Sequence, residues 1–177
     1  MAQAESRLRL FFALWPDAGT RALLAGLQRA LGQQAGGRLV APENLHLTMA
    51  FLGMQPAPLL PAIAAVLDQI ALPEMTLQVD CYGYFPRARI AWAGIVQPPA
   101  ALLALHDALI AVLGRCDIGH DKEATFRPHI TLMRNATAGG AATVAPVCWH
   151  APQLALVQST TTARGPVYRV LARRAAA

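Results

Sequence analysis

Two histidines of the chain occur in matching frames, each followed two positions later by a threonine. His46 and Thr48 lie within LHLTMAFLG, and His129 and Thr131 lie within FRPHITLMR. Side chains alternate across a β-strand, so each histidine shares one face with its threonine while the apolar residue between them takes the other face. Two such units facing one another would place a proton donor and a proton acceptor around one substrate, which suits cleavage of a phosphodiester.

A metal site is the rival interpretation of two histidines. Zinc sites usually need three or four ligands at short local spacings, and the sequence has no HxH, HExxH or histidine–cysteine cluster. Threonine is also a poor zinc ligand. We therefore expect no metal, and we interpret the histidines without a repeated context as surface residues: His106, His120 and His150.

The composition favours a soluble, cytoplasmic protein with an acidic partner. The 177 residues are 55% hydrophobic and 14% charged, which fits one well-packed domain over residues 1–177. The net charge of +5 suits nucleic acid, although the arginines near the C-terminus could equally form a solvated basic tail. Three widely spaced cysteines without a CxxC pair predict reduced thiols. We find no signal-peptide pattern and no uninterrupted apolar stretch of about 18 residues, so we expect no membrane segment.

Strand and helix patterns alternate along the chain. Runs of branched and aromatic residues between Gly and Pro predict strands over 7–15, 45–52, 75–85, 90–96, 126–133, 154–162 and 167–173. Leucine spacing predicts helices over 17–31, 59–70 and 98–114. Gly53 should end the first histidine strand, residues 116–125 should form a polar loop, and the Gly- and Ala-rich residues 137–145 should form a linker or flexible loop.

The order of these elements is repeated. Strand, helix and histidine strand in the first half are answered by strand, helix and histidine strand in the second, which indicates an internal duplication. This alternation predicts an α/β (α+β) fold that is bilobal, with pseudo-twofold duplicated sheets, outer helices and a central cleft. One histidine strand would lie on each wall of the cleft, because burying these polar pairs without partners would be costly.

Both motifs match the HxTx signature of the 2H phosphoesterase superfamily. Further similarity lies in RLFFALWP near the N-terminus, in the residues around both motifs, and in QSTTTARGPVYRVL near the C-terminus. Together these segments resemble the bacterial and archaeal RNA 2',3'-cyclic phosphodiesterases, also called 2'-5' RNA ligases, over nearly the whole chain. The resemblance implies a single 2H phosphoesterase domain over residues 1–177.

The resemblance also implies roles for individual residues. His46 would be the proton donor and His129 the proton acceptor, an assignment that the residues alone do not make. Thr48 and Thr131 would donate hydrogen bonds to the non-bridging phosphate oxygens. Arg134 matches a position associated with phosphate contact, but strand parity places it on the face opposite to His129.

Three further residues have weaker grounds. Arg127 has the strand parity of His129. Phe11 and Phe12 alternate, so one faces the core, and a cleft-facing Phe11 could stack on a base, with core packing as its alternative role. Tyr168 matches a family position for which we assign no role.

We expect metal-independent hydrolysis of an RNA-terminal 2',3'-cyclic phosphate to a 2'-phosphomonoester, without a cofactor and by a monomer. RNA with such an end would be the partner, and the reverse reaction would join RNA ends through a 2'-5' linkage. Two alternatives stay open. One is a 2H phosphoesterase acting on a small cyclic nucleotide or 2'-5' oligoadenylate, and the other is a non-catalytic RNA-binding module.

Overall fold

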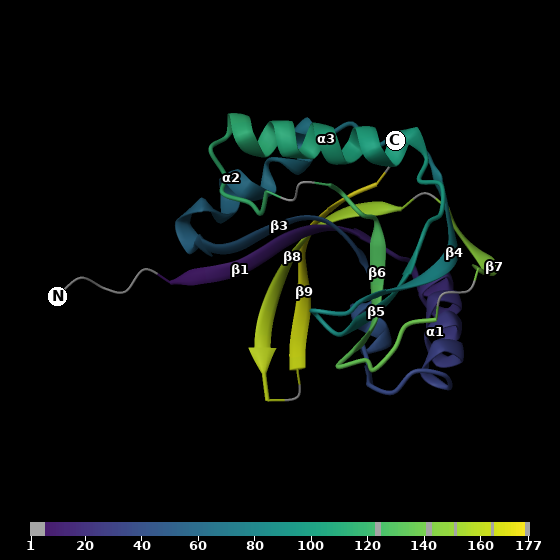
Figure 1. The fold of residues 1–177 in the computed structure, drawn as a ribbon. Helices are drawn as coiled ribbons and strands as arrows, with labels where there is room; N and C mark the ends of the chain where they lie inside the picture. The colour runs from purple at the N-terminus through teal and green to yellow at the C-terminus, as the bar shows by residue number, and fades with distance from the viewer. Residues whose placement is uncertain (1–5, 123–124, 141–142, 151, 164, 176–177) are drawn as a thin grey trace.

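Nine strands of the described residues pair antiparallel into one sheet, which brings the two histidine motifs onto neighbouring strands (Figure 1). This computed structural model describes residues 6–122, 125–140, 143–150, 152–163 and 165–175. The strands follow the order β7-β4-β5-β6-β3-β1-β8-β9, and β2 lies beside β6. Their bounds are β1 (Arg7–Trp15), β2 (Arg38–Leu39), β3 (Leu47–Pro56), β4 (Thr76–Phe85), β5 (Ile90–Gly94), β6 (His129–Arg134), β7 (Thr143–His150), β8 (Gln153–Thr162) and β9 (Gly165–Arg174).

The two halves of the sheet meet at a single residue pair. Leu47 of β3 pairs with Ile130 of β6, and this is the only register pair between these strands in the described part of the chain. Leu47 is the middle residue of the first histidine motif and Ile130 is the middle residue of the second. The predicted mixed α/β class is confirmed, whereas the two sheets expected from the repeat are halves of one sheet.

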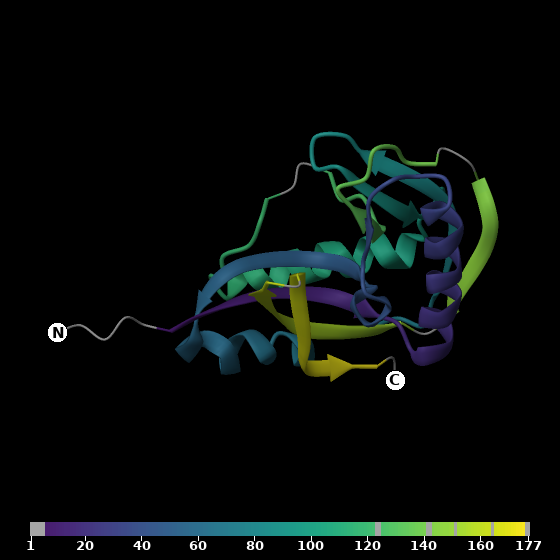
Figure 2. The ribbon, with the colours of Figure 1, turned by 90° about the horizontal axis from the view of Figure 1, so that it is seen from below.

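Each half contains the predicted succession of strand, helix and histidine strand. Helix α1 (Ala18–Gly32) connects β1 to the segment before β3, and α3 (Ala100–Arg115) connects β5 to the segment before β6. Both helices cross to the other half, because α1 contacts β6 and β7 whereas α3 contacts β3. In Figure 2 the purple α1 stands beside the light-green β7. This exchange stabilises two halves that share only one backbone pair.

Local sequence explains the two long helices. Asp17 caps α1 by accepting a hydrogen bond from the backbone N–H of Thr20 at 2.7 Å. Helix α3 begins directly after Pro99, and its buried residues recur at helical spacing: Leu102, Leu105, Leu109, Val112 and Leu113.

The sheet is apolar on both faces around β1. Phe12 belongs to the main core, which lies between the sheet and the helices, and it is fully buried. Phe11 belongs to a smaller cluster on the other face, together with Ala13, Trp15, Ala155 and Val157. The predicted alternation of Phe11 and Phe12 is therefore confirmed.

Several predicted boundaries differ from the structure. The helix predicted over 59–70 is reduced to α2 (Leu60–Ala64) between 3₁₀ turns at Ala57–Leu59 and Leu67–Gln69, although its apolar residues are buried as expected: Ile63, Val66, Leu67 and Ile70. Strand β6 begins at His129 and not at 126, because Pro128 has no N–H for the ladder. The loop predicted over 137–145 is shorter, since β7 begins at Thr143; residues 141–142 lie outside the described residues.

The prediction that Gly53 ends the first histidine strand is wrong, because Gly53 lies within β3. Its φ of +65° falls in the left-handed region that glycine tolerates. The pairing of β1 with β3 shifts register beside it, where Leu10 faces Gly53 and Phe11 faces Phe51. Gly53 therefore supplies a β-bulge, and β3 continues to Pro56.

Gln28, a buried residue of α1, connects the helix to the segment before β3 and to β6. Gln28 is only 2% exposed, and its Nε2 donates hydrogen bonds to the carbonyl oxygens of Val40 at 2.7 Å and Leu132 at 2.8 Å. Leu132 follows the second motif directly, so Gln28 positions the backbone of β6 beside the histidine.

Replacing Gln28 by alanine is expected to lower the free energy of unfolding by about 2 kcal/mol, because the carbonyls of Val40 and Leu132 each lose one hydrogen bond and a cavity forms. Urea denaturation of both proteins measures the difference. Gln34→Ala, at an exposed position shortly after α1, is the control and should change stability by less than about 0.5 kcal/mol. Equal losses in the two variants would contradict a positioning role for Gln28.

Candidate active site

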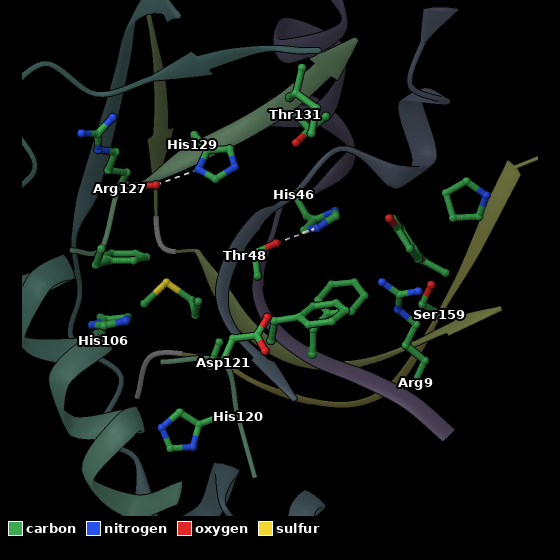
Figure 3. Close-up of a pocket in the computed structure, with 18 of the residues that line it drawn as sticks. Arg9, His46, Thr48, His106, His120, Asp121, Arg127, His129, Thr131 and Ser159 are labelled. Carbon is green, nitrogen blue, oxygen red and sulfur yellow. Dashed lines mark hydrogen bonds between the residues drawn. The ribbon is translucent and has the colours of Figure 1, made fainter. Parts of the chain in front are cut away.

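Both motif imidazoles are held by the same kind of backbone contact. Nδ1 of His46 lies 2.6 Å from the carbonyl oxygen of Asn44, and Nδ1 of His129 lies 2.7 Å from that of Arg127. Since a carbonyl oxygen only accepts, each Nδ1 carries the hydrogen and donates it. In each ring Nε2 is then the nitrogen that can gain or lose a proton, and both rings line the same pocket (Figure 3).

Aromatic rings enclose His46. Its ring centroid lies 4.9 Å from that of Phe11, 5.4 Å from that of Trp15 and 5.2 Å from that of Tyr168. Burial lowers the pKa of His46 from 6.5 to about 4, and the hydrogen bond to Asn44 only partly opposes this effect. His46 is therefore neutral at pH 7.

Positive neighbours act on His46 in the same direction as burial. Charge on His129, when that imidazole is protonated, and charge on Arg134 also lower the pKa of His46, by electrostatic repulsion of its proton. His46, His129 and Arg134 line one pocket, so the space beside the His46 ring should attract an anion and repel a cation.

His129 lies in a more open setting. Phe85 meets its ring edge-on at 5.1 Å between centroids, and the Trp92 ring lies 6.0 Å away. The hydrogen bond from His129 to Arg127 is exposed, whereas that from His46 to Asn44 is partly buried. The two motifs are thus alike in backbone contact and unlike in environment.

The two threonines share the pocket with the histidines, as predicted. The Thr48 hydroxyl lies 3.1 Å from Nε2 of His46, and it donates to this nitrogen while the imidazole is neutral (Figure 3). Thr131 lines the same pocket on the side of β6. The hydroxyls are therefore placed to contact a group that lies between the two imidazoles.

Arg134 also lines the pocket, contrary to the strand parity inferred from the sequence. On the neighbouring strand β5, Trp92 pairs with Thr131, and the residue before it, Ala91, pairs with Met133. Leu132 therefore has no partner on β5 and is an additional residue of β6. Leu132 and Met133 are both buried in the core, and the alternation resumes one position later. This β-bulge turns Arg134 to the face of Thr131.

A corresponding bulge follows the first motif. Opposite β3, Ala13 pairs with Thr48 and Phe12 pairs with Ala50, which leaves Met49 as the additional residue. Phe51 then lines the pocket at the position that Arg134 occupies in the second motif. The pocket-lining residue that follows the bulge is thus a phenylalanine on β3 and an arginine on β6.

The pocket has a volume of about 750 Å³ and a positive lining. Its cations outnumber the one carboxylate of the described lining, Asp121; the cations are Arg9, Lys122, Arg127 and Arg134. The Arg9 guanidinium lies 5.0 Å from the centroid of the Phe51 ring, a cation–π contact, and Figure 3 shows Arg9 beside Ser159. An anionic, partly aromatic ligand would suit this lining.

Several pocket residues were not predicted from the sequence. His106 and His120, expected at the surface, line the pocket, and the His106 ring stacks on Phe126 at 4.0 Å between centroids. His150 is exposed, as expected. Arg9 could have been found from parity, because it lies two residues before Phe11 on β1 and faces the same way.

Phe11 lies against His46 and lines the pocket, but it is only 2% exposed. Little of its ring is free to stack on a base. The neighbouring Phe51, which is half-buried, presents more surface to the pocket.

Two further expectations concern a metal site and a membrane-spanning segment. Among the described residues, no three His, Cys, Asp or Glu side chains gather closely enough to hold a metal ion. No helix in the described part of the chain is both long and apolar enough to span a bilayer.

Comparisons with known proteins point to one family. Residues 15–162 match the family model of the 2'-5' RNA ligase superfamily. The chain is 36% identical over 129 residues to an RNA 2',3'-cyclic phosphodiesterase of Escherichia coli, covering 73% of each protein. It is 33% identical, over an alignment of 178 positions, to a protein of the same name from Thermus thermophilus, covering 93% of this chain and 88% of that one.

A solved structure agrees in fold. E. coli LigT complexed with 3'-AMP superimposes with a TM-score of 0.81 at 34% identity, covering 97% of this chain and 99% of that one. The fold of this chain therefore agrees with the family match. This chain belongs to the 2'-5' RNA ligase superfamily.

Proposed function

We propose that this protein hydrolyses the 2',3'-cyclic phosphate at an RNA end to a 2'-phosphomonoester. The observation that carries the proposal is the pair of imidazoles in one pocket, each bound through Nδ1 to a backbone carbonyl and each left with Nε2 for proton transfer. Relatives in the family are named RNA 2',3'-cyclic phosphodiesterases, which supports cyclic phosphodiester hydrolysis as the reaction.

In the proposed reaction a water oxygen attacks phosphorus and the bond from phosphorus to the 3' oxygen breaks. His129 accepts the water proton at Nε2, while His46 donates a proton from Nε2 to the departing 3' oxygen. The product is a 2'-phosphomonoester with a free 3'-hydroxyl, and the two imidazoles have exchanged protonation states. With an RNA 5'-hydroxyl in the place of water, the same proton transfers would form a 2'-5' linkage.

The surroundings of the two histidines support this division of roles. A base that activates water needs access to solvent, and the hydrogen bond that holds His129 is the more exposed one. A low pKa makes His46, once protonated, a strong acid toward an alkoxide leaving group. Phe11, Trp15 and Tyr168 would shield that proton from bulk water.

Three further side chains that line the pocket would bind the phosphate. Thr48 and Thr131 would donate hydroxyl hydrogen bonds to its non-bridging oxygens, and Arg134 would add a guanidinium that matches the geometry of a phosphate. Their contribution should grow in the pentavalent transition state, where negative charge on these oxygens increases. Phe11 would then serve mainly to orient His46, and Phe51 is the better candidate for stacking on a base.

Incubation in EDTA with a short RNA ending in a 2',3'-cyclic phosphate should yield the 2'-phosphate, resolved from the 3'-phosphate by chromatography. Replacing either His46 or His129 by alanine should lower kcat/KM by about 10²–10⁴-fold, because each supplies one proton transfer. His150→Ala, at an exposed position outside the pocket, is the matched control and should be neutral.

The outcomes separate the alternatives. Activity on small cyclic nucleotides but not on RNA ends would retain the two histidines and change the substrate. Binding of RNA without turnover of either substrate would favour a non-catalytic RNA-binding module. Loss of activity in EDTA, restored by a divalent cation, would contradict the metal-independent mechanism.

The proposed acid must gain a proton when the phosphate binds, since burial leaves His46 neutral in the free protein. A bound anion offsets the repulsion from His129 and Arg134, so it should raise the pKa of His46 from about 4 by at least about one unit. An NMR titration of the His46 Cε1–H signal, with and without saturating sodium sulfate, measures this shift.

Sodium chloride at equal ionic strength is the control, and the signal is assigned by its loss in His46→Asn. The protonated form of His46 should persist to higher pH in sulfate than in chloride. An identical pKa in the two salts would contradict the coupling between anion binding and protonation.

A further inference from the structure

We propose that a second anion site adjoins the catalytic pocket and binds the 5'-phosphate of the terminal nucleotide, the phosphate that connects it to the rest of the RNA. The proposal rests on the proposed function, because it places the cyclic phosphate of the same nucleotide between the two histidines. The central residue is Arg38 of β2, to which the catalytic steps assign no role.

A separate hollow lies beside the catalytic pocket. It has a volume of about 180 Å³, and its lining shares three residues with the larger pocket: Arg134, Pro166 and Tyr168. The remaining lining comes from β2 and the segment that leads to the first motif: Arg38, Leu39, Val40, Ala41 and Asn44. A ligand that occupies both hollows would therefore pass Arg134.

Two arginines on neighbouring strands line this hollow. Arg38 of β2 pairs with Arg134 of β6 in the antiparallel ladder, and side chains of such a pair lie on the same face of the sheet. Like charges in this arrangement repel one another, whereas an anion between them is attracted to both. Among the described residues, no carboxylate forms an ion pair with Arg134.

Gly165, the first residue of β9, leaves room for the Arg38 side chain. Gly165 has a φ of +115°, and a Cβ atom built on it would lie 3.3 Å from Nη1 of Arg38. A side chain at this position would be strained and would press on the guanidinium. The glycine therefore keeps the hollow open where Arg38 enters it, next to Pro166.

The arrangement matches the covalent structure of a nucleotide. Arg38 and Arg134 come from neighbouring strands, which lie about 4.8 Å apart, so one ligand can contact both arginines. In the proposed binding mode the cyclic phosphate lies between His46, His129 and Arg134, and the 5' side of the same ribose points along the shared lining toward β2. Phosphate is also the group that guanidinium binds best in two-pronged geometry, which favours the phosphate over the base as occupant.

The test compares adenosine 2',3'-cyclic phosphate with the same nucleotide carrying a 5'-phosphate. The unmodified protein should turn over the 5'-phosphorylated substrate with a kcat/KM about tenfold higher, from one charge-assisted contact. Arg38→Gln should abolish that preference, and Arg38→Lys should retain part of it as a point charge. Arg29→Gln removes the same charge from an exposed position of α1 and should leave the preference intact.

Equilibrium binding separates this proposal from the proposed reaction. Adenosine 2',5'-bisphosphate should bind more tightly than 2'-AMP to the unmodified protein and equally to Arg38→Gln, whether or not turnover occurs. If the binding preference is present without hydrolysis, the reaction fails and the second site stands. Equal affinities in the unmodified protein, or an equal loss for both ligands in Arg38→Gln, would overturn the second site.

Discussion

The backbone pair between Leu47 and Ile130 determines how the two histidine motifs face one another. It is the single register pair between β3 and β6 in the described part of the chain, and it joins the middle residues of both motifs. Because side chains alternate with a period of two, a slip of one strand by one residue at this point would turn its histidine to the face opposite to the other histidine. The pair does not act alone: α1 packs on the half that contains β6, α3 packs on the half that contains β3, and Gln28 fixes the carbonyl that follows the second motif. The geometry of proton transfer is thus set by a narrow contact that packing and hydrogen bonds on both sides hold in register.

Strand parity predicts which side chains share the site only where the alternation along a strand is unbroken. Strand parity correctly places Thr48 and Thr131 with their histidines, because the alternation is local and unbroken over three residues. It fails at Arg134, since the additional residue Leu132 is defined by pairing with β5 and not by any local signal. Most strands are predicted within a few residues where apolar residues alternate. Strand β7 is missed because Pro146 and a Gly- and Ala-rich approach resemble a loop, and a sheet edge tolerates proline.

Two nearly identical motifs become chemically unlike through residues distant in sequence. His46 is enclosed by aromatic rings from β1 and β9, while His129 is contacted by rings from β4 and β5 and stays closer to solvent. The position five residues after each histidine carries Phe51 in one motif and Arg134 in the other. A motif of three residues therefore identifies the reacting groups but cannot assign acid and base. That assignment depends on burial and charge, which arise only when the sheet has formed.

Arg134 acts on both ligand and proton in the proposed reaction. Its charge attracts a phosphate into the pocket, and the same charge opposes protonation of the nearby His46. The lowered pKa of His46 corresponds to a cost of protonation on the order of 3 kcal/mol relative to an exposed imidazole. A phosphate bound between the motifs supplies the opposite charge at short range and offsets much of this cost. The pocket would then hold a charged acid only while an anion is present, so the proton is available at the phosphate that needs it and is absent from the empty site. Such coupling requires Arg134 and His46 to face the same space, which is the consequence of the bulge at Leu132.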